Sequence, residues 1–392
     1  MNESISDNKP GYTMWQMIFY MLRLGAFGFG GPVALVGYMH RDLVESRKWV
    51  SEADYKEGLA LSQLAPGPLA AQLAIYLGYV HYRVLGATFA GVAFVIPSFL
   101  IVIALGWAYV RFGGLPWMHA AFYGVGAAVI GIIVMSAKKL TEKSVGKDKL
   151  LWAIYAVLAL VTIATESEIA WLFIAAGVLV WIWRAPPKWL QRGNVNALAV
   201  TQFPVLSSLY ATADLPLLGQ IALFFTKAGA FVFGSGLAIV PFLYGGVVTE
   251  HQWLTEKQFV DAVAVAMITP GPVVITVAFI GYLVAGMSGA TLAALATFLP
   301  CYLFTIIPAP YFKKYGKVPG VVAFVDGITA AAIGAIAGSV IVIAKRTIVD
   351  LPTAGLALCT ILILWRFRKL QEPVIVAAAA FLGLIMYPFF GH

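Results

Sequence analysis

Two basic residues stand inside apolar stretches, at matching places in the two halves of the chain. Arg23 precedes the segment Gly-Ala-Phe-Gly-Phe-Gly-Gly-Pro, and Lys227 precedes Gly-Ala-Phe-Val-Phe-Gly-Ser-Gly. A cation at membrane depth costs roughly 2.5–3.5 kcal/mol on insertion scales. The alternative is that the long side chain reaches the headgroups, because Arg23 is close to Trp15 along the chain. Retention of a cation in both copies favours a charge that binds an anion.

Glycines after each cation would let the backbone approach such an anion. Without a Cβ atom they permit an open backbone whose N–H groups face a ligand, and a helix that begins there adds its positive dipole end. Glycines also serve close helix packing, so they favour a site only beside the cations. The candidate ligand-binding glycines are Gly28, Gly30, Gly31, Gly234 and Gly236.

A Pro-Gly-Pro motif occurs once in each half, at residues 66–68 and 270–272. A proline inside a helix loses a hydrogen bond and clashes with the preceding turn, whereas a proline suits the first position of a new helix. Each motif therefore predicts a break between two half-helices at membrane depth. A kinked continuous helix is the alternative, since membrane helices tolerate proline. The candidate substrate-binding residues at these breaks are Gln63, Pro66, Gly67, Pro270 and Gly271.

Three acidic residues are candidates for charge pairing or proton coupling. Glu57 and Asp261 are equivalent, and each precedes its Pro-Gly-Pro motif by nine residues. They are either interfacial or partners of the cations. Asp326 lies in a long apolar run and has no acidic counterpart in the first half, so it is the better candidate for carrying a proton. A structural hydrogen bond is the alternative role for Asp326.

The elements that position these residues are written twice along the chain. An offset of 204 aligns Trp49 with Trp253 without a gap, and an offset of 203 then aligns Pro97 with Pro300. The protein is therefore an internal duplication. The predicted segments are an N-terminal membrane repeat at 1–185, a connector at 186–215 and a C-terminal membrane repeat at 216–392.

Composition indicates an all-α polytopic membrane protein. Of the 392 residues, 61% are hydrophobic and only 11% are charged, about half the charged share of a soluble domain. Apolar runs of membrane-spanning length recur to the end of the chain. The net charge of +8 does not indicate nucleic acid, because the basic residues lie in short loops between apolar runs.

The motifs of several enzyme classes are missing from the sequence. It contains no Gly-x-x-x-x-Gly-Lys-Ser/Thr segment for binding nucleotide phosphates. Its five histidines are scattered without the spacing of metal ligands, and no nucleophile arrangement occurs. We therefore expect no enzymatic activity, no cofactor and no metal.

Loop charges predict how often the chain crosses the membrane. Ser51-x-x-Asp54 and Thr255-x-x-Gln258 predict the starts of the two broken helices. If each broken helix returns to its own side, every half crosses five times, and with the N-terminus outside nearly all basic clusters lie inside. Five is odd, so the two repeats are inverted and both termini lie outside. Inverted repeats with broken helices are typical of secondary transporters, whose substrate site lies where the repeats meet.

The motifs also resemble a known family. Phe27-Gly-Phe-Gly-Gly-Pro32 and Gln63-Leu-Ala-Pro66-Gly-Pro68, together with the weaker copies Phe233-Gly-Ser-Gly236 and residues 270–272, resemble the chromate ion transporter (CHR) family, in its long-chain, two-domain branch. The likeness covers nearly the whole chain. The second half departs from the pattern, with Ser235 and Gly236 in place of Gly-Pro and Met267 in place of Gln63. This departure leaves open whether both halves bind substrate equally.

The resemblance implies a multi-pass protein of the bacterial cytoplasmic membrane that exports chromate, with exchange of sulfate or protons. The residues by themselves indicate a secondary transporter of an anion. Chromate is the first expected substrate and sulfate the second. A sulfate uptake carrier, a passive anion channel and a membrane assembly or receptor protein are the alternatives. The expected partners are the oxyanion and the lipid bilayer, with a second copy of the chain as a further candidate and no nucleic acid.

Overall fold

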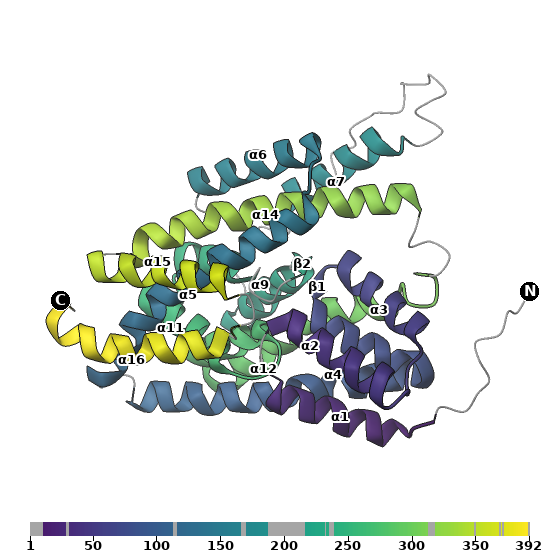
Figure 1. The fold of residues 1–392 in the computed structure, drawn as a ribbon, viewed down its shortest axis with the longest axis horizontal. Coiled ribbons are helices and arrows are strands. Elements are labelled where there is room, and N and C mark those ends of the chain that lie inside the picture. Colours follow the sequence, from purple (N-terminus) through teal and green to yellow (C-terminus); the bar gives the residue numbers. More distant parts are fainter. Residues whose placement is uncertain are drawn as a thin grey trace, which may run out of the picture.

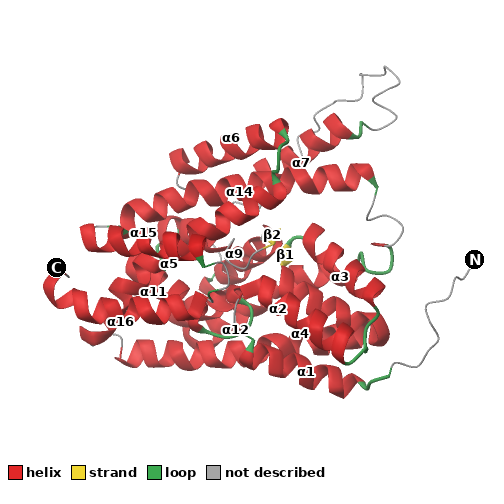
Figure 2. Ribbon diagram, viewed as in Figure 1, coloured by secondary structure: helices red, strands yellow, loops and turns green. Residues whose placement is uncertain are grey.

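The structure is a computed structural model, and it is built almost entirely of helices (Figures 1 and 2). It describes residues 11–28, 31–112, 116–165, 170–186, 216–231, 233–234, 239–312, 318–348, 350–367, 370 and 372–390. The elements of the first half are α1 (Met14–Phe27), α2 (Gly31–Met39), the π-helix η1 (His40–Ser46), α3 (Glu52–Leu64), β1 (Gly67–Pro68), α4 (Leu69–Phe112), α5 (Pro116–Ser144), α6 (Lys149–Thr165) and α7 (Ala170–Arg184).

The second half repeats this order of elements. They are α9 (Leu217–Phe231), β2 (Phe233–Gly234), α10 (Ile239–Tyr244), the π-helix η5 (Gly245–Glu250), α11 (Glu256–Ile268), the 3-10 helix η6 (Val273–Ile275), α12 (Thr276–Ile306), α14 (Pro319–Thr347), α15 (Leu351–Arg366) and α16 (Glu372–Phe390). The predicted connector, residues 186–215, falls outside the described residues except for its first position.

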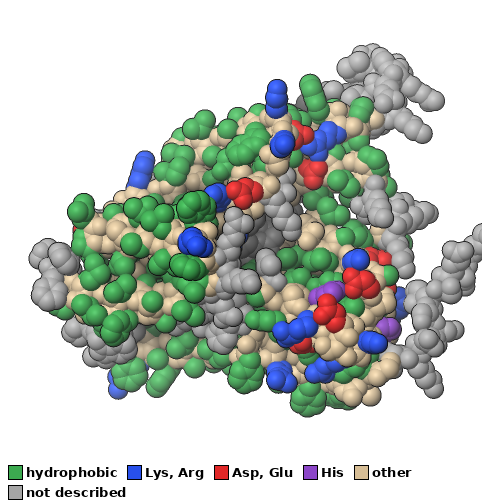
Figure 3. Space-filling model, viewed as in Figure 1, with side chains coloured by type: hydrophobic (Ala, Val, Ile, Leu, Met, Phe, Trp, Pro, Cys, Tyr) green, Lys and Arg blue, Asp and Glu red, His purple; other side chains and the backbone are tan. Residues whose placement is uncertain are grey.

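The length and surface of the helices fit a multi-pass membrane protein. By length and composition, three helical segments of the described chain can cross a membrane: Leu69–Phe112, Val273–Ile306 and Pro319–Val342. Five shorter apolar helices accompany them. Hydrophobic side chains cover much of the surface, and charged ones gather over the end formed by α1, α2 and α3 (Figure 3). Such a surface suits a lipid environment.

The predicted breaks at the Pro-Gly-Pro motifs are confirmed. Ser51 accepts a hydrogen bond from the backbone N–H of Asp54 at the start of α3, and Thr255 forms a complete capping box at the start of α11. Both helices end in extended backbone, at Ala65 and at Thr269, directly before the prolines. The alternative of a kinked continuous helix is therefore excluded.

After each break the chain folds back on itself, so α4 is two antiparallel helices in sequence. A Cβ atom on Gly58 of α3 would lie 2.3 Å from the Tyr76 ring, which shows that α3 packs against the beginning of α4. Arg83, with φ 51°, then interrupts α4. A Cβ atom on Gly91 would lie 2.8 Å from Ile75 Cγ1, so residues 84–112 run back along residues 69–82. In α12 the same interruption falls at Ala285 and Gly286.

The first apolar run also folds back, although the sequence predicts that it makes the first of five crossings in its half. Helix α1 ends at Gly28, whose backbone is extended. The Tyr20 hydroxyl donates to the Tyr38 carbonyl, 3.2 Å away, and the Tyr12 ring stacks on Trp49 with centroids 4.9 Å apart. Residue 49 has therefore returned to the end of the molecule where α1 begins.

This turn changes the predicted number of crossings. Each half has two hairpins that turn back, followed by four further helices: in the first half these are residues 84–112, α5, α6 and α7. The first of the five crossings expected in the first half is interrupted where α1 ends at Gly28. The start of α1 and the end of α16 lie at opposite ends of the molecule (Figure 1), whereas we expected both termini on one side.

The last helices of each half pack against helices of the other half. Helix α5 packs against α15 and α16 of the second half, and α14 packs against α6 and α7 of the first. A Cβ atom on Gly124 would lie 2.0 Å from the Ala379 carbonyl oxygen, and one on Gly327 would lie 2.5 Å from the Ala176 carbonyl oxygen. These two contacts are related by the offset of 203, so the halves share one interface used twice, as in a two-fold dimer.

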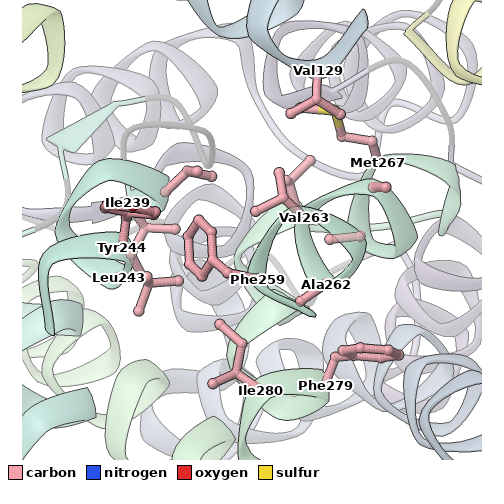
Figure 4. Packing of buried hydrophobic residues seen from close by; sticks show 14 of the residues in the cluster. Val129, Ile239, Leu243, Tyr244, Phe259, Ala262, Val263, Met267, Phe279 and Ile280 are labelled. Atoms are coloured by element: carbon pink, nitrogen blue, oxygen red, sulfur yellow. The ribbon is translucent and has the colours of Figure 1, made fainter. Parts of the chain in front are cut away.

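The largest hydrophobic core draws on both halves. Figure 4 shows Phe259 of α11 beside Leu243 and Tyr244 of α10, and the Tyr244 and Phe259 ring centroids are 5.3 Å apart. Val129 of the first half lies next to Met267 in the same core. Packing of this kind fixes the broken helices of the second half against α5 of the first.

Candidate functional site

The broken segments of the two halves meet and pair with each other. Strand β1, at the Pro-Gly-Pro break of the first half, pairs in parallel with β2, which follows Lys227 in the second half. Gly67 is opposite Phe233 in this pair. The equivalent contact also forms with the halves exchanged, because the Gly271 N–H donates to the Gly28 carbonyl over 2.9 Å. Each Pro-Gly-Pro break is thus joined to the glycine-rich break of the other half.

Glycine is required at the centre of both motifs. Gly67 has φ 141° and Gly271 has φ 89°, values that L side chains rarely adopt. A Cβ atom on Gly67 would lie 2.7 Å from Gln72 Nε2 and 3.2 Å from Cys301 Sγ. One on Gly271 would lie 2.0 Å from Ser98 Oγ. These close approaches explain why the duplication keeps both glycines.

Ser98 and Cys301 were not predicted as site residues, although their positions carry a signal. They are equivalent and directly follow Pro97 and Pro300. Ser98 lies at the break of the second half, where its hydroxyl donates to the Gly25 carbonyl over 3.2 Å. Cys301 lies against the break of the first half. A small residue after a repeated mid-helix proline marks a place where another backbone comes close.

Gln72 is a buried polar side chain directly behind the first break. It is 0% exposed, and its Nε2 donates to the Pro66 carbonyl over 2.8 Å. Its Oε1 has no hydrogen-bond partner within the described part of the chain. A buried acceptor of this kind needs a donor, so a ligand or a water molecule at the break would satisfy it.

Each of the two equivalent acids interacts with a tyrosine hydroxyl. Asp261 is 2% exposed and accepts a hydrogen bond from the Tyr109 hydroxyl over 2.7 Å. Glu57 is half-buried and interacts with the Tyr76 hydroxyl of its own half. The predicted pairing of these acids therefore includes tyrosine hydroxyls, and Tyr109 is a residue that sequence reasoning missed.

Asp326 is not an unpaired acid, which removes the reason for choosing it as the proton carrier. Its carboxylate lies 2.6 Å from an Arg184 guanidinium nitrogen. Arg184 also forms an ion pair with Asp148 in the α5–α6 turn, and that hydrogen bond lowers the pKa of the Asp148 carboxyl. Arg184 therefore joins the end of α7, the α5–α6 turn and α14.

The two predicted cations lie in different surroundings. Arg23 is exposed and lines an open pocket of about 520 Å³ formed by residues 20–47. Lys227 is half-buried, and its charge acts on the ring of His251, the counterpart of Arg47. Each cation therefore lies near the return segment of its own half.

The remaining predicted residues are placed as follows. Gly28 is buried at the end of α1, and Gly31 is the first residue of α2. Gln63 is exposed on α3, so Gln72 is the glutamine that faces the break. Gly30 and Gly236 lie outside the described residues. Pro66, Pro270 and Gly234 all belong to the joined segments.

The sequence is similar to those of known proteins over nearly the whole chain. A family profile described as chromate transporter matches residues 15–181 and 219–384. The chain is 73% identical over 383 residues to a chromate transport protein of Cupriavidus metallidurans, covering 98% of this chain and 96% of the relative. It is 60% identical to a probable chromate transport protein of Synechococcus elongatus, covering 98% and 99%.

A more distant relative also matches nearly the whole chain. A chromate transport protein of Pseudomonas aeruginosa is 31% identical over 401 residues, which covers 97% of this chain and 94% of the relative. No solved structure matches the chain.

Proposed function

The chain belongs to the chromate transporter family, and we propose that it exports chromate across the bacterial cytoplasmic membrane as a secondary transporter. The observation that carries the proposal is the joining of the two broken segments, Gly67 to Phe233 and Gly271 to Gly28. In secondary transporters, substrate sites form from such discontinuous helices where two repeats meet. The substrate names of the relatives supply the chemistry, a tetrahedral divalent oxyanion.

We infer that the two repeats are inverted in the membrane. Tyr123, near the beginning of α5, hydrogen-bonds Asp350, which precedes α15. Asp326, near the beginning of α14, pairs with Arg184 at the end of α7. Equivalent helices therefore begin at opposite ends of the molecule. By the loop charges, the end that holds Asp148 and Arg184 is cytoplasmic.

The proposed binding site lies at the joined breaks, between the two cations. A dianion that leaves water needs compensating charge, because uncompensated charge in a low dielectric is prohibitively costly. Arg23 and Lys227 supply one positive charge each, and backbone N–H groups of the glycine-rich and Pro-Gly-Pro segments supply hydrogen bonds. The Oε1 of buried Gln72 can accept a hydrogen bond from a water molecule bound beside the anion.

Alternating access then follows from the shared interface. The exchanged helices α5, α14 and their neighbours form a frame, and the hairpins α1–α2, α3–α4, α9–α10 and α11–α12 carry the joined breaks. Rocking of the hairpins against the frame would open the site to one face at a time. Coupling to protons or to sulfate exchange belongs to the same proposal.

Chromate uptake into everted membrane vesicles tests this function. We expect saturable uptake that responds to an imposed proton gradient or to sulfate loaded inside, because a carrier binds each ion before moving it. Uptake that rises linearly with chromate at ion-channel rates would overturn the carrier and favour a passive channel. Sulfate uptake without any chromate transport would favour the sulfate carrier instead.

A further inference from the structure

A pocket rich in arginine opens at the end of the molecule where α1 begins. It has a volume of about 520 Å³ and is formed by α1, α2 and η1 (Figure 3 shows the charged side chains gathered over this end). We call it the arginine pocket. Its charged and hydroxyl-bearing lining includes Tyr20, Arg23, Tyr38, Arg41, Asp42 and Arg47.

The charges of the arginine pocket leave two positive charges for a ligand. Arg41 is neutralised by its neighbour Asp42, with Nε 2.9 Å from the carboxylate. Arg23 and Arg47 have no carboxylate within ion-pair distance among the described residues. Three arginines less one aspartate thus give a charge of +2, which matches a dianion, and Arg23 is shared with the site proposed at the joined breaks.

Aromatic rings hold one of these guanidinium groups in place. The Arg47 guanidinium carbon lies 4.5 Å from the Trp49 ring centroid and 5.3 Å from that of Tyr20. Stacking of this kind orients the planar group, so that its N–H donors meet an oxyanion with little loss of freedom. Arginine can bind two oxygens of a tetrahedral anion at once.

In the second half, aromatic rings occupy the position equivalent to the arginine pocket. The offset of 204 replaces Tyr20 by Phe224, Tyr38 by Phe242 and Arg47 by His251. Phe224 stacks on Phe242 with centroids 5.5 Å apart, and His251 stacks on Trp253 with centroids 4.3 Å apart. We call Phe224, Phe242, His251 and Trp253 the aromatic cluster.

The aromatic cluster lacks most of the charge of the arginine pocket, since Lys227 is the one counterpart of the three arginines that stays basic. Asp42 and Arg41 are replaced by Gly246 and Gly245, and a Cβ atom on Gly246 would lie 1.9 Å from the Phe224 ring. Phe224 therefore occupies the position of the missing side chain. Burial also lowers the pKa of His251, so this counterpart of Arg47 is uncharged at neutral pH.

We propose that the arginine pocket is a loading site for tetrahedral oxyanion dianions, present on one face of the transporter only. The inference rests on the proposed function and extends it. Anions from the cytoplasmic face are collected by the arginine pocket before they reach the joined breaks, whereas the opposite face has the closed aromatic cluster. The path through the joined breaks is thus symmetric, whereas its two entrances differ. This difference favours the binding of the anion from the cytoplasm when its concentration there is low.

Chromate transport by Arg47→Gln vesicles tests this proposal, with Lys48→Gln as the matched control. Lys48 is exposed in the same loop, but it does not line the pocket, so its variant loses an equal charge nearby. Initial rates over a range of chromate concentrations are measured in everted vesicles, which present the cytoplasmic face, and in right-side-out vesicles. Membrane insertion is checked for each variant by size-exclusion chromatography after mild detergent extraction.

We expect Arg47→Gln to raise the half-saturating chromate concentration at least tenfold in everted vesicles and to leave it unchanged in right-side-out vesicles. Lys48→Gln should stay within twofold of the wild type in both. Arg47→Lys keeps the positive charge but lacks the planar set of N–H donors, so its half-saturating concentration should lie between those of Arg47→Gln and Lys48→Gln. If Arg47→Gln does not insert into the membrane, Arg47→Lys is the variant that tests the proposal.

The outcomes separate this inference from the proposed function. If the wild type transports chromate and the Arg47→Gln and Lys48→Gln variants have the same half-saturating concentration, the loading site is overturned. The transporter proposal would still stand. An equal rise on both faces would assign Arg47 to the shared path and would also overturn a one-sided site. Absence of chromate transport by the wild type would overturn both proposals together.

Discussion

The Tyr109 hydroxyl donates a hydrogen bond to the Asp261 carboxylate over 2.7 Å, across the boundary between the two halves. Tyr109 belongs to α4 of the first half, and Asp261 is almost fully buried on α11 of the second. A buried carboxylate is costly unless a donor satisfies it, so this contact holds α11 against the first half. Glu57, the equivalent acid, interacts within its own half, which makes the two repeats unequal at this position.

Tyr109→Phe should lower the free energy of unfolding by about 1–3 kcal/mol, because it leaves one oxygen of the buried carboxylate without this donor. The measurement is thermal or denaturant unfolding of purified protein in one detergent. Tyr282→Phe is the control, since Tyr282 is half-buried and has no hydrogen-bond partner for its hydroxyl among the described residues. Equal stability of both variants would show that the Tyr109 contact contributes nothing net.

Gly271→Ala should abolish transport and destabilise the protein. Backbone strain at φ 89° costs about 1–3 kcal/mol, and the new Cβ atom would collide with the Ser98 hydroxyl at 2.0 Å. Gly355→Ala is the matched control, because Gly355 lies within α15 with nothing within 4 Å and gains helix propensity. Expression level, melting temperature and chromate uptake are compared. Wild-type behaviour of Gly271→Ala would mean that the joined breaks relax freely and do not shape the site.

A cross-link between positions 184 and 326 should leave transport intact. Arg184 and Asp326 join α7 to α14, which both belong to the frame, and alternating access requires movement of the hairpins against this frame. Arg184→Cys and Asp326→Cys are combined with Cys359→Ser, which removes the exposed native cysteine. Chromate uptake should be equal before and after oxidation. Inhibition by oxidation that reduction reverses would show that α7 moves against α14 during the cycle.

Asp326→Asn is expected to leave the proton dependence of transport unchanged. The ion pair with Arg184 occupies the carboxylate, and partly exposed ion pairs contribute at most about 1 kcal/mol to stability. Uptake is measured at several imposed pH gradients in wild-type and variant vesicles. Loss of pH-driven uptake with substrate exchange intact would restore Asp326 as the proton carrier that its position in the sequence suggested.

Arg23→Ala and Lys227→Ala should each weaken chromate binding at least tenfold, about 1.4 kcal/mol, because each removes half of the compensating charge. Arg23→Lys should cost less than Arg23→Ala, although lysine cannot bind two oxygens of the anion at once. Binding is measured on folded, membrane-inserted variants by displacement with sulfate. Wild-type affinity of both alanine variants would mean that the two cations only reach towards the headgroups.

Cysteine labelling tests the placement of the chain in the membrane. Gly11→Cys and Lys147→Cys lie at the end assigned to the cytoplasm, and Leu351→Cys lies at the beginning of α15 at the other end; all three positions are exposed. In a Cys359→Ser background, an impermeant reagent should label position 351 in intact cells and positions 11 and 147 only after permeabilisation. Labelling of position 11 together with 351 would place the beginning of the chain outside, as the loop charges predicted.

The sequence alone determined the elements and the chemistry of this protein. Its duplication, the helix starts at Ser51 and Thr255 and the breaks after Ala65 and Thr269 all follow from local rules, since proline and glycine disrupt a helix whatever surrounds them. The paired cations and the glycine-rich motifs likewise predicted an anion site and its family.

Only the tertiary structure decided which segments meet. That β1 joins β2, that α5 packs on α16 and that Asp326 pairs with Arg184 are contacts across more than a hundred residues, and a local pattern carries no information on partners at that distance. The first run was mispredicted for the same reason. An apolar stretch long enough to cross a membrane is also long enough for two half-helices, and the stacking of Tyr12 on Trp49 selects the hairpin.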